Sequence, residues 1–461
     1  MSRVMAGSSG WFTLEDSKAA FNLFCCVYGI GTLGMPANFA RAGPFYASIA
    51  LLFMAFANVY ASVAVSRVML VAPPTVKTYS DLGEWAMGPR GRWAVVISQT
   101  AVCLLVPCAF LVLGGTLLQV LFPGAFSQSF WIVFMAMMVL PVCLIPTLKE
   151  GAGVAFAGCL GTLFSDVIAM GVLVHGMHES PSALSTPPAP DVSFHQVLTT
   201  FGNLSLAYGA AIVIPDLQRQ HSQPQRMPRV IGVTLTFISI LFLVLATTGY
   251  RVAGCQISGN LLFSITGIHS GDVAGASPLG FTSHRGAVVL AFFFMQVHIT
   301  IAFAAILHPA FYTAERLLLG MHGASDQYHS MERAGHQDDD GDDDEGANST
   351  SKSRVLRYVA LRCLLVMLLV LLALALRDHF LELADFIGAS CIAVCCLILP
   401  LLFYVRVLDD SLSRLERTVA LSIVAISGIL GLYVTLSAGL GLLRTAPHGS
   451  GEPPFPFCPA G

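Results

Sequence analysis

The sequence predicts an all-α polytopic membrane protein of about eleven spans, in which two matching helices are broken near their middles. Hydrophobic residues make up 55% of the 461-residue chain and charged residues only 11%, against roughly 25% in an ordinary soluble domain. The apolar residues gather into runs of about 20, the length that crosses a bilayer as an α-helix. Glycine and proline interrupt the first and the sixth of these runs, which lie five spans apart.

Each of the eleven apolar runs is bounded by polar or turn-forming residues. In chain order they cover residues 17–39, 44–71, 93–122, 129–147, 151–175, 194–217, 229–252, 286–312, 355–376, 380–405 and 417–443. Thr13 and Asp16 form a plausible N-cap just before the first run. We therefore expect one transmembrane domain over residues 17–443, with short tails at 1–16 and 444–461.

The basic residues predict how the chain is oriented. If the N-terminus lies in the cytosol, 19 of the 24 Lys and Arg residues fall on or near the inner side, as the positive-inside rule requires. The tail at 1–16 is then cytosolic and the tail at 444–461 extracytosolic. Of twelve cysteines, only Cys255 and Cys458 fall in segments placed outside, so one disulfide is conceivable. The polar first residues argue against a cleaved signal peptide.

The longest inner loop is expected over residues 313–353. It contains the acidic block DDDGDDDE at Asp338–Glu345. A block of like charges is typical of a disordered, solvated linker, and a regulatory contact is the alternative.

The two broken runs carry the information about function. The first reads FNLFCCVYGIGTLGMP and the second reads FGNLSLAYGAAIVIP. A break within hydrocarbon is tolerated only where the freed backbone groups face protein or a watery cavity. A matched pair of such breaks is the best sequence indication of a transporter's central site. Because five spans separate them, the two broken helices run in opposite directions, which predicts a five-plus-five inverted repeat with one extra helix.

The broken ends predict what the site binds. Free N–H groups at the start of a half-helix attract a carboxylate, and carbonyls at a half-helix end accept from an ammonium group. The site would therefore bind a zwitterion with backbone groups alone. The alternative is that the glycines only let helices pack closely. The residues expected at the breaks are Gly29, Gly31, Thr32, Gly34, Asn203, Ser205, Tyr208 and Gly209.

Four segments, in order, resemble the amino acid/auxin permease family. They are FNLFCCVYGIGTLGMPANFARAG, YGAAIVIPDLQRQHSQPQRMP, AGCQISGNLLFSI and FIGASCIAVCCLILPLLFY, and the resemblance extends from about Ser17 to Tyr433. It implies a LeuT-like fold and secondary transport of amino acids, usually coupled to sodium or protons. It adds Asn22 to the substrate-site candidates. It also implies a multi-pass protein of the plasma membrane or of an endolysosomal or vacuolar membrane.

The residues that decide ion coupling depart from the family pattern. Sodium-coupled relatives carry an Asn where this chain has Cys25, and a thiol is a poor ligand for a hard cation. Asp166 and His298 lie inside apolar runs and are candidate proton carriers, with structural roles as the alternative. Thr300 could offer a hydroxyl to a cation. We therefore expect coupling to protons, or no coupling, rather than to sodium.

The sequence thus predicts a transporter whose partners are an amino acid and the lipid bilayer. A sensor that binds the same ligand with little flux is the alternative function. No HExxH or GxSxG motif indicates an enzyme. We expect neither a metal site, a cofactor other than a coupling ion, nor nucleic acid binding.

Overall fold

The helices of the computed structural model account for every predicted span. The structure describes residues 11–145, 151–179, 188–266, 277–320, 344–444 and 457–458. Among them, nine helical stretches are long and apolar enough to cross a membrane, and α4 (Gln128–Cys143) is a shorter apolar helix. The first predicted span joins the second across a kink, which explains the difference from eleven. The all-α prediction is confirmed for this part of the chain.

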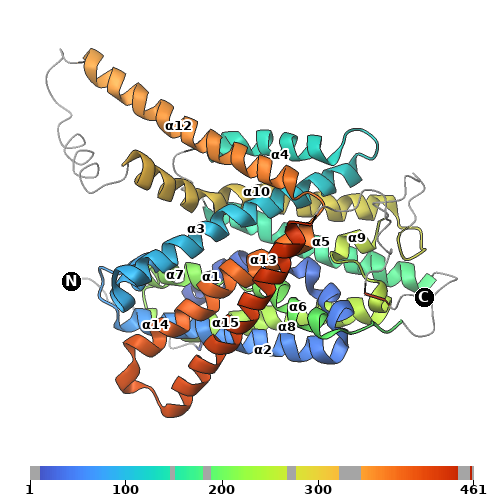
Figure 1. Ribbon diagram of the computed structural model, residues 1–461, viewed down its shortest axis with the longest axis horizontal. Coiled ribbons are helices and arrows are strands. Elements are labelled where there is room, and N and C mark those ends of the chain that lie inside the picture. The colour runs from blue at the N-terminus through green and yellow to red at the C-terminus, as the bar shows by residue number, and fades with distance from the viewer. Residues whose placement is uncertain are drawn as a thin grey trace. The chain divides into compact units, whose positions relative to one another are not determined.

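The elements follow the predicted order (Figure 1). Those up to the middle of the chain are α1 (Leu14–Val27), η1 (Ile30–Gly34), α2 (Met35–Val71), α3 (Tyr79–Leu121), α4 and α5 (Gly151–Glu179). The next are α6 (Phe194–Leu206), η2 (Ala211–Val213), α7 (Ile214–Gln220), η3 (Pro224–Arg226), α8 (Met227–Ala253), η4 (Gly254–Gln256), α9 (Leu261–Ser264) and α10 (Arg285–Leu319). The last are α12 (Asp344–Ala375), α13 (Phe380–Ile387), the π-helical η5 (Gly388–Ile392) and η6 (Val394–Ile398), α14 (Leu399–Val407), η7 (Asp409–Ser411) and α15 (Arg414–Leu442).

Local sequence signals set where several helices begin and bend. The expected N-cap at Thr13 is confirmed as a capping box with Asp16. The kink in α2 lies at Gly43, whose φ of 72° is in the left-handed region, and Pro44 follows it. This pair ends the first span and starts the second, since glycine adopts positive φ without strain and proline starts a helix well.

The chain divides into two compact units. The first comprises Met1–Gln99, Ala152–His298 and Leu381–Gly461, and the second comprises Thr100–Gly151 and Ile299–Phe380. In the first unit, α2 packs along α6 and α8 (Figure 1). The buried face of α2 includes Leu51, Met54, Ala57, Ala61 and Val65, whose spacing places them on one side of the helix.

A buried ion pair organises the second unit, in which α12 packs against α4. Arg362 of α12 pairs with Glu315 of α10 at 2.7 Å, and both side chains are almost fully buried. Arg362 also donates to the carbonyls of Cys143 and Ile145 at the end of α4. Cys143 is the last residue of α4, where carbonyls have no partner inside the helix, so Arg362 caps α4 as well as pairing with Glu315.

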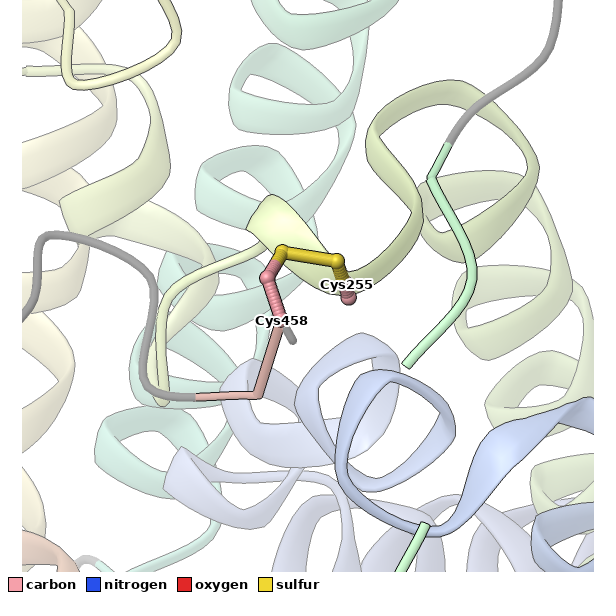
Figure 2. The surroundings of a disulfide bond; sticks show 2 residues. All are labelled: Cys255 and Cys458. Atoms are coloured by element: carbon pink, nitrogen blue, oxygen red, sulfur yellow. A yellow bond between two sulfur atoms is a disulfide. The ribbon is translucent and has the colours of Figure 1, made fainter. Parts of the chain in front are cut away.

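A disulfide joins Cys255 to Cys458 (Figure 2). It connects η4, directly after α8, with the C-terminal tail, and the sequence had singled out this pair. Beside it, the N–H of Asp191 donates to the carbonyl of Phe457, and the N–H of Cys255 donates to Pro188. The tail is thereby held against the segment that leads into α6.

The acidic loop lies mostly outside the described residues. Helix α10 continues to Leu319 and α12 begins at Asp344, and residues 321–343 between them are not among those described. The prediction of disorder over 313–353 is wrong at both ends, because residues 313–319 continue α10 and residues 344–353 belong to α12. For residues 321–343, and for the sidedness of the two tails, it stays a prediction.

Candidate substrate and ion site at the two helix breaks

The first helix break lies between α1 and η1. Helix α1 ends at Val27, and the N–H of Tyr28 donates to the carbonyl of Phe24. Gly29 is extended, and both the N–H and the hydroxyl of Thr32 donate to its carbonyl, each at 3.0 Å. The first N–H groups of the half-helix that follows have no partner inside that helix. The break predicted at Gly29–Gly34 is therefore present.

The second break lies between α6 and η2. Helix α6 ends at Leu206, and a tight turn carries the N–H of Ala210 to the carbonyl of Tyr208 at 2.7 Å. The thiol of Cys396, from η6, lies at the backbone N–H groups of Ala211 and Ile212. Cys396 therefore lies close to the N-terminal end of this half-helix.

Two glycines of the first break pack closely against the second broken span. A Cβ at Gly31 would lie 2.6 Å from Cα of Ala207, just past the end of α6. A Cβ at Gly34 would overlap the side chain of Asn203. Gly31 and Gly34 therefore do allow close helix packing, which was the alternative interpretation of the sequence. The two helices are nevertheless interrupted here, so close packing and helix breaks occur together. A Cβ at Gly209, in contrast, would meet only an ordinary contact with Ile392 among the described residues, at 3.8 Å.

Asn203 connects the two broken helices. Its Oδ1 accepts a hydrogen bond from Nδ2 of Asn38 at 2.9 Å, and both side chains are buried. Asn38 lies on the part of α2 that continues the first broken span. Asn38 was not among the predicted site residues, although an Asn in the apolar segment MPANFA indicates a buried polar contact.

Aromatic side chains line the same region. The ring of Tyr28 stacks on Phe24 and lies 6.1 Å from Phe242 of α8. Tyr208 meets Phe242 edge to face at 5.2 Å, and its hydroxyl donates to Ser239 at 2.8 Å. The two breaks thus share a largely apolar wall, which suits the side chain of a small ligand.

Helix α5 brings a carboxylate to the first break. Asp166 is 1% exposed, and its neighbours are the hydroxyls of Tyr28 and Thr32. Neither carboxylate oxygen has a hydrogen bond of acceptable geometry within the described part of the chain. His298 lies on α10, and its Nδ1 is hydrogen-bonded to the carbonyl of Gly158 at 2.9 Å. The other ring nitrogen, Nε2, lies next to Gly29, 3.3 Å from the position that a Cβ there would take. Both proton-carrier candidates therefore lie beside this break.

The other predicted residues are less central. Asn22 is half-buried on α1, one turn before Cys25, whose thiol contacts the thiol of Cys159 on α5. The hydroxyl of Ser205 is buried without a hydrogen-bond partner among the described residues. Thr300 belongs to the second compact unit, so its role beside the break stays a prediction.

Ionic contacts hold the N-terminal end of α1. Asp16, fully buried, accepts from Arg226 of η3 at 2.7 Å and lies 3.1 Å from Nε2 of His221. Burial disfavours the charged form of Asp16, but hydrogen bonds from Arg226 and Thr13 outweigh this effect and hold the pKa of the carboxyl well below its ordinary value. Glu15 accepts from the N–H of Ser222 at 2.7 Å. We call the contacts of Glu15 and Asp16 with residues 221–226 the α1 latch.

A second ion pair lies near the kink of α2. Arg41 donates to Asp385 of α13 at 2.8 Å, and their side chains are 12% and 4% exposed. A Cβ on Gly202 of α6 would lie 2.6 Å from the backbone of Asp385. The pair thus joins α2 to α13 where α13 meets α6.

Sequence comparison identifies the family. The family model described as transmembrane amino acid transporter protein matches residues 16–440. The chain belongs to this family. The match confirms the resemblance to amino acid/auxin permeases, and the family is one of transporters rather than enzymes.

Curated relatives are similar at low identity. Amino acid transporter AVT1I of Arabidopsis thaliana is 26% identical over 57% of this chain and 64% of its own length. Vacuolar amino acid transporter 7 of Saccharomyces cerevisiae is 24% identical over 55% of this chain and 52% of its own length. The match therefore spans about half to two thirds of these two relatives. Amino acid transporter ANT1 of Arabidopsis thaliana is 22% identical over 91% of both chains.

Solved structures show the same fold. MhsT in complex with L-phenylalanine superposes with a TM-score of 0.56 at 13% identity, over 91% of this chain and 98% of that one. A manganese transporter of Eremococcus coleocola gives a TM-score of 0.56 at 13% identity, over 97% and 91% of the two chains. Both are LeuT-fold transporters, so the LeuT-like fold implied by the resemblance is confirmed.

Proposed function

We propose that this protein moves zwitterionic α-amino acids across a membrane by alternating access. The observation that carries the proposal is the meeting of two broken helices, Gly31 against Ala207, in a chain of the amino acid transporter family. The names of the curated relatives support the same substrate class. The membrane is the plasma membrane or an endolysosomal or vacuolar one, the latter in line with the name of the yeast relative.

The two breaks have different parts in binding. The N–H groups at the start of η1 suit the substrate carboxylate, because they are at the positive end of a half-helix. The equivalent end at Ala211 is in contact with the thiol of Cys396, so we assign the carboxylate to the first break. Carbonyls at the ends of α1 and α6 suit the ammonium group. The aromatic wall around Tyr28 and Tyr208 contacts the side chain.

We further propose that transport is proton-coupled or uncoupled rather than sodium-coupled. Cys25 faces another thiol, Cys159, and offers no hard oxygen ligand at the position where sodium-coupled relatives carry an amide. Asp166 and His298 are instead buried groups that can exchange protons beside the first break.

Uptake by the purified protein in liposomes tests these proposals. Each standard amino acid is supplied with a radiolabel at pH 5.5 and 7.5, in sodium and in choline buffers. We expect uptake of one or more zwitterionic amino acids that is unaffected by replacing sodium with choline. Binding without uptake would favour the sensor, and uptake that requires sodium would contradict the coupling proposal.

A further inference from the structure

One turn of α5 carries polar groups that lack partners in the described part of the chain. Thr162, Ser165 and Asp166 are each no more than 1% exposed. Among the described residues, the two hydroxyl oxygens and the two carboxylate oxygens have no hydrogen bond of acceptable geometry, although the hydroxyls of Tyr28 and Thr32 lie beside the carboxylate. A buried polar group without a partner has lost its hydrogen bonds to water and gained none in return, which destabilises the fold. Several on one helical turn therefore indicate that something else satisfies them.

The three side chains lie on one face of α5. Their spacing of three and four residues places them together, whereas Phe164 and Val167, between and after them, are exposed on another side. The face is turned to the first break, since Tyr28 and Thr32 are neighbours of the Asp166 carboxylate. The hydroxyl proton of Thr32 is already donated to Gly29.

The hydroxyls of Thr162 and Ser165 differ from those of several buried threonines, and they share the lack of a partner among the described residues with Ser205, Ser277 and Ser427. Those of Thr199, Thr200 and Thr234 donate to a carbonyl three or four residues earlier in their own helices. This local bond is the ordinary way for a helical Ser or Thr to be satisfied. Its absence at Thr162 and Ser165 leaves both hydroxyls available to a ligand beside Asp166.

The titratable neighbours are few. Tyr28 lies beside the carboxylate, and Cys159 with Cys25 lies about two turns earlier along α5. On α10, His298 is bonded to Gly158 and packs over Gly161. No ion pair to Asp166 is found among the described residues. An unpaired carboxylate this buried is stable only as the neutral acid or with a bound cation.

We propose that Thr162, Ser165 and Asp166 form the proton-binding site of this transporter, with Asp166 carrying the proton. This inference rests on the proposed function and deepens it by choosing a proton over no coupling ion and Asp166 over His298. The two hydroxyls hold the carboxyl group and any water that delivers the proton. Contact with Thr32 at the break links loading of the proton to the substrate site.

The test uses the full chain in liposomes that contain a pH-sensitive dye. Tritiated standard amino acids, supplied one by one, report transport, the dye reports proton entry, and exchange against preloaded unlabelled amino acid reports carrier movement alone. For the wild type we expect proton entry with the amino acid and faster uptake at lower external pH. Asp166→Asn should abolish both effects while exchange persists. Asp378→Asn, at an exposed carboxylate, is the control.

A milder variant covers the case in which Asp166→Asn does not fold. Thr162→Val keeps the shape of the side chain, and we expect it to move the pH of half-maximal uptake by about half a unit or more. Thr234→Val, whose hydroxyl bonds within its own helix, should leave that pH unchanged.

The other outcomes separate the two proposals. Unchanged proton entry in Asp166→Asn, or an unmoved pH profile in Thr162→Val, would overturn the proton site. Two results would overturn the proton site but leave the proposal of amino acid transport intact. One is wild-type transport without proton entry, and the other is a sodium dependence that Asp166→Asn removes. Absence of uptake and exchange of every amino acid would refute both proposals.

Discussion

At the residue scale, glycines determine how closely the elements of the first unit approach. A Cβ on Gly388 would overlap the carbonyl oxygen of Gly202, and a Cβ on Gly202 would press on Asp385. The tenth span is π-helical over Gly388–Ile392, where this approach occurs, and again over Val394–Ile398. The sequence motif predicted a helix here but not its form, because a π-helix depends on the contact with α6 rather than on local propensity.

Gly388→Ala should therefore destabilise the protein. The added methyl group meets backbone, which cannot rotate away, and overpacking of this kind costs about 1–3 kcal/mol or more. Gly428→Ala is the matched control, because a Cβ there has no neighbour within 4 Å. Thermal unfolding in detergent measures both variants. Equal melting temperatures would contradict the packing described here.

The ion pair of Arg41 with Asp385 gives a second prediction at this scale. Asp385→Asn leaves a largely buried guanidinium without its counter-charge, and breaking such a pair costs about 3–5 kcal/mol. Adding Arg41→Gln should recover part of that loss, since no uncompensated charge then remains. Thermal unfolding of the two single variants and the double variant measures this coupling, and strictly additive losses would show that the pair is not coupled.

At the scale of elements, α1 is a half-helix held at one end by the α1 latch and interrupted at the other. The glycine and proline pattern was sufficient to predict both breaks, and the spacing of Thr13 and Asp16 predicted the N-cap. It could not predict the latch, because Asp16 and Arg226 lie 210 residues apart in the sequence. Nor could it predict Cys396 at the second break, since a cysteine inside an apolar run reads as a small hydrophobic residue.

Asp16→Asn should loosen α1. Hydrogen bonds to a charged group are worth about 1.5–3 kcal/mol each, so amide hydrogen exchange over residues 14–27 should become at least about tenfold faster. The control is Asp410→Asn, which makes the same change from carboxylate to amide but at an exposed site. It should leave amide exchange over residues 14–27 unchanged. Equal exchange in Asp16→Asn and the wild type would argue that the latch does not restrain α1.

The latch should also resist moderate acid. The pKa of Asp16 is lowered in the folded protein, so its contribution to stability is complete above the unfolded pKa of about 3.9 and is lost only as the pH falls below that value. Exchange over residues 14–27, corrected for the intrinsic rate, should therefore be constant between pH 5 and 8. A rise in corrected exchange at pH 5 would contradict this sign.

At the scale of the whole molecule, eleven apolar runs and paired breaks predicted an all-α membrane protein with an inverted repeat, and the family resemblance implied the LeuT-like fold. The two cysteines placed outside the spans made one disulfide conceivable, and the structure joins them. The site was predicted less fully. The sequence did not indicate a role for three polar residues, because that role depends on neighbours on other helices: Asn38, Thr162 and Ser165.

The disulfide allows a test of sidedness. A protease site inserted within residues 445–456 and an epitope tag after Gly461 leave the cut tail attached through Cys255–Cys458. We expect external protease to cut the protein in intact cells if it reaches the surface, or in sealed organelles only from the lumen. After the cut, the tagged tail of the wild type should separate from the protein only when the disulfide is reduced. In Cys458→Ser, the tagged tail should separate without reduction. Cutting from the cytosolic side would contradict the predicted topology.

The most direct test of the central claim is uptake of the transported amino acid by Gly31→Leu in liposomes. A leucine side chain at Gly31 must force η1 away from Ala207, whereas Gly171→Leu, on the same scaffold, meets no atom within 4 Å of its Cβ. We predict that Gly31→Leu abolishes uptake while the protein still folds and inserts, and that Gly171→Leu transports at the wild-type rate. Normal uptake by Gly31→Leu would contradict a substrate site at the two helix breaks.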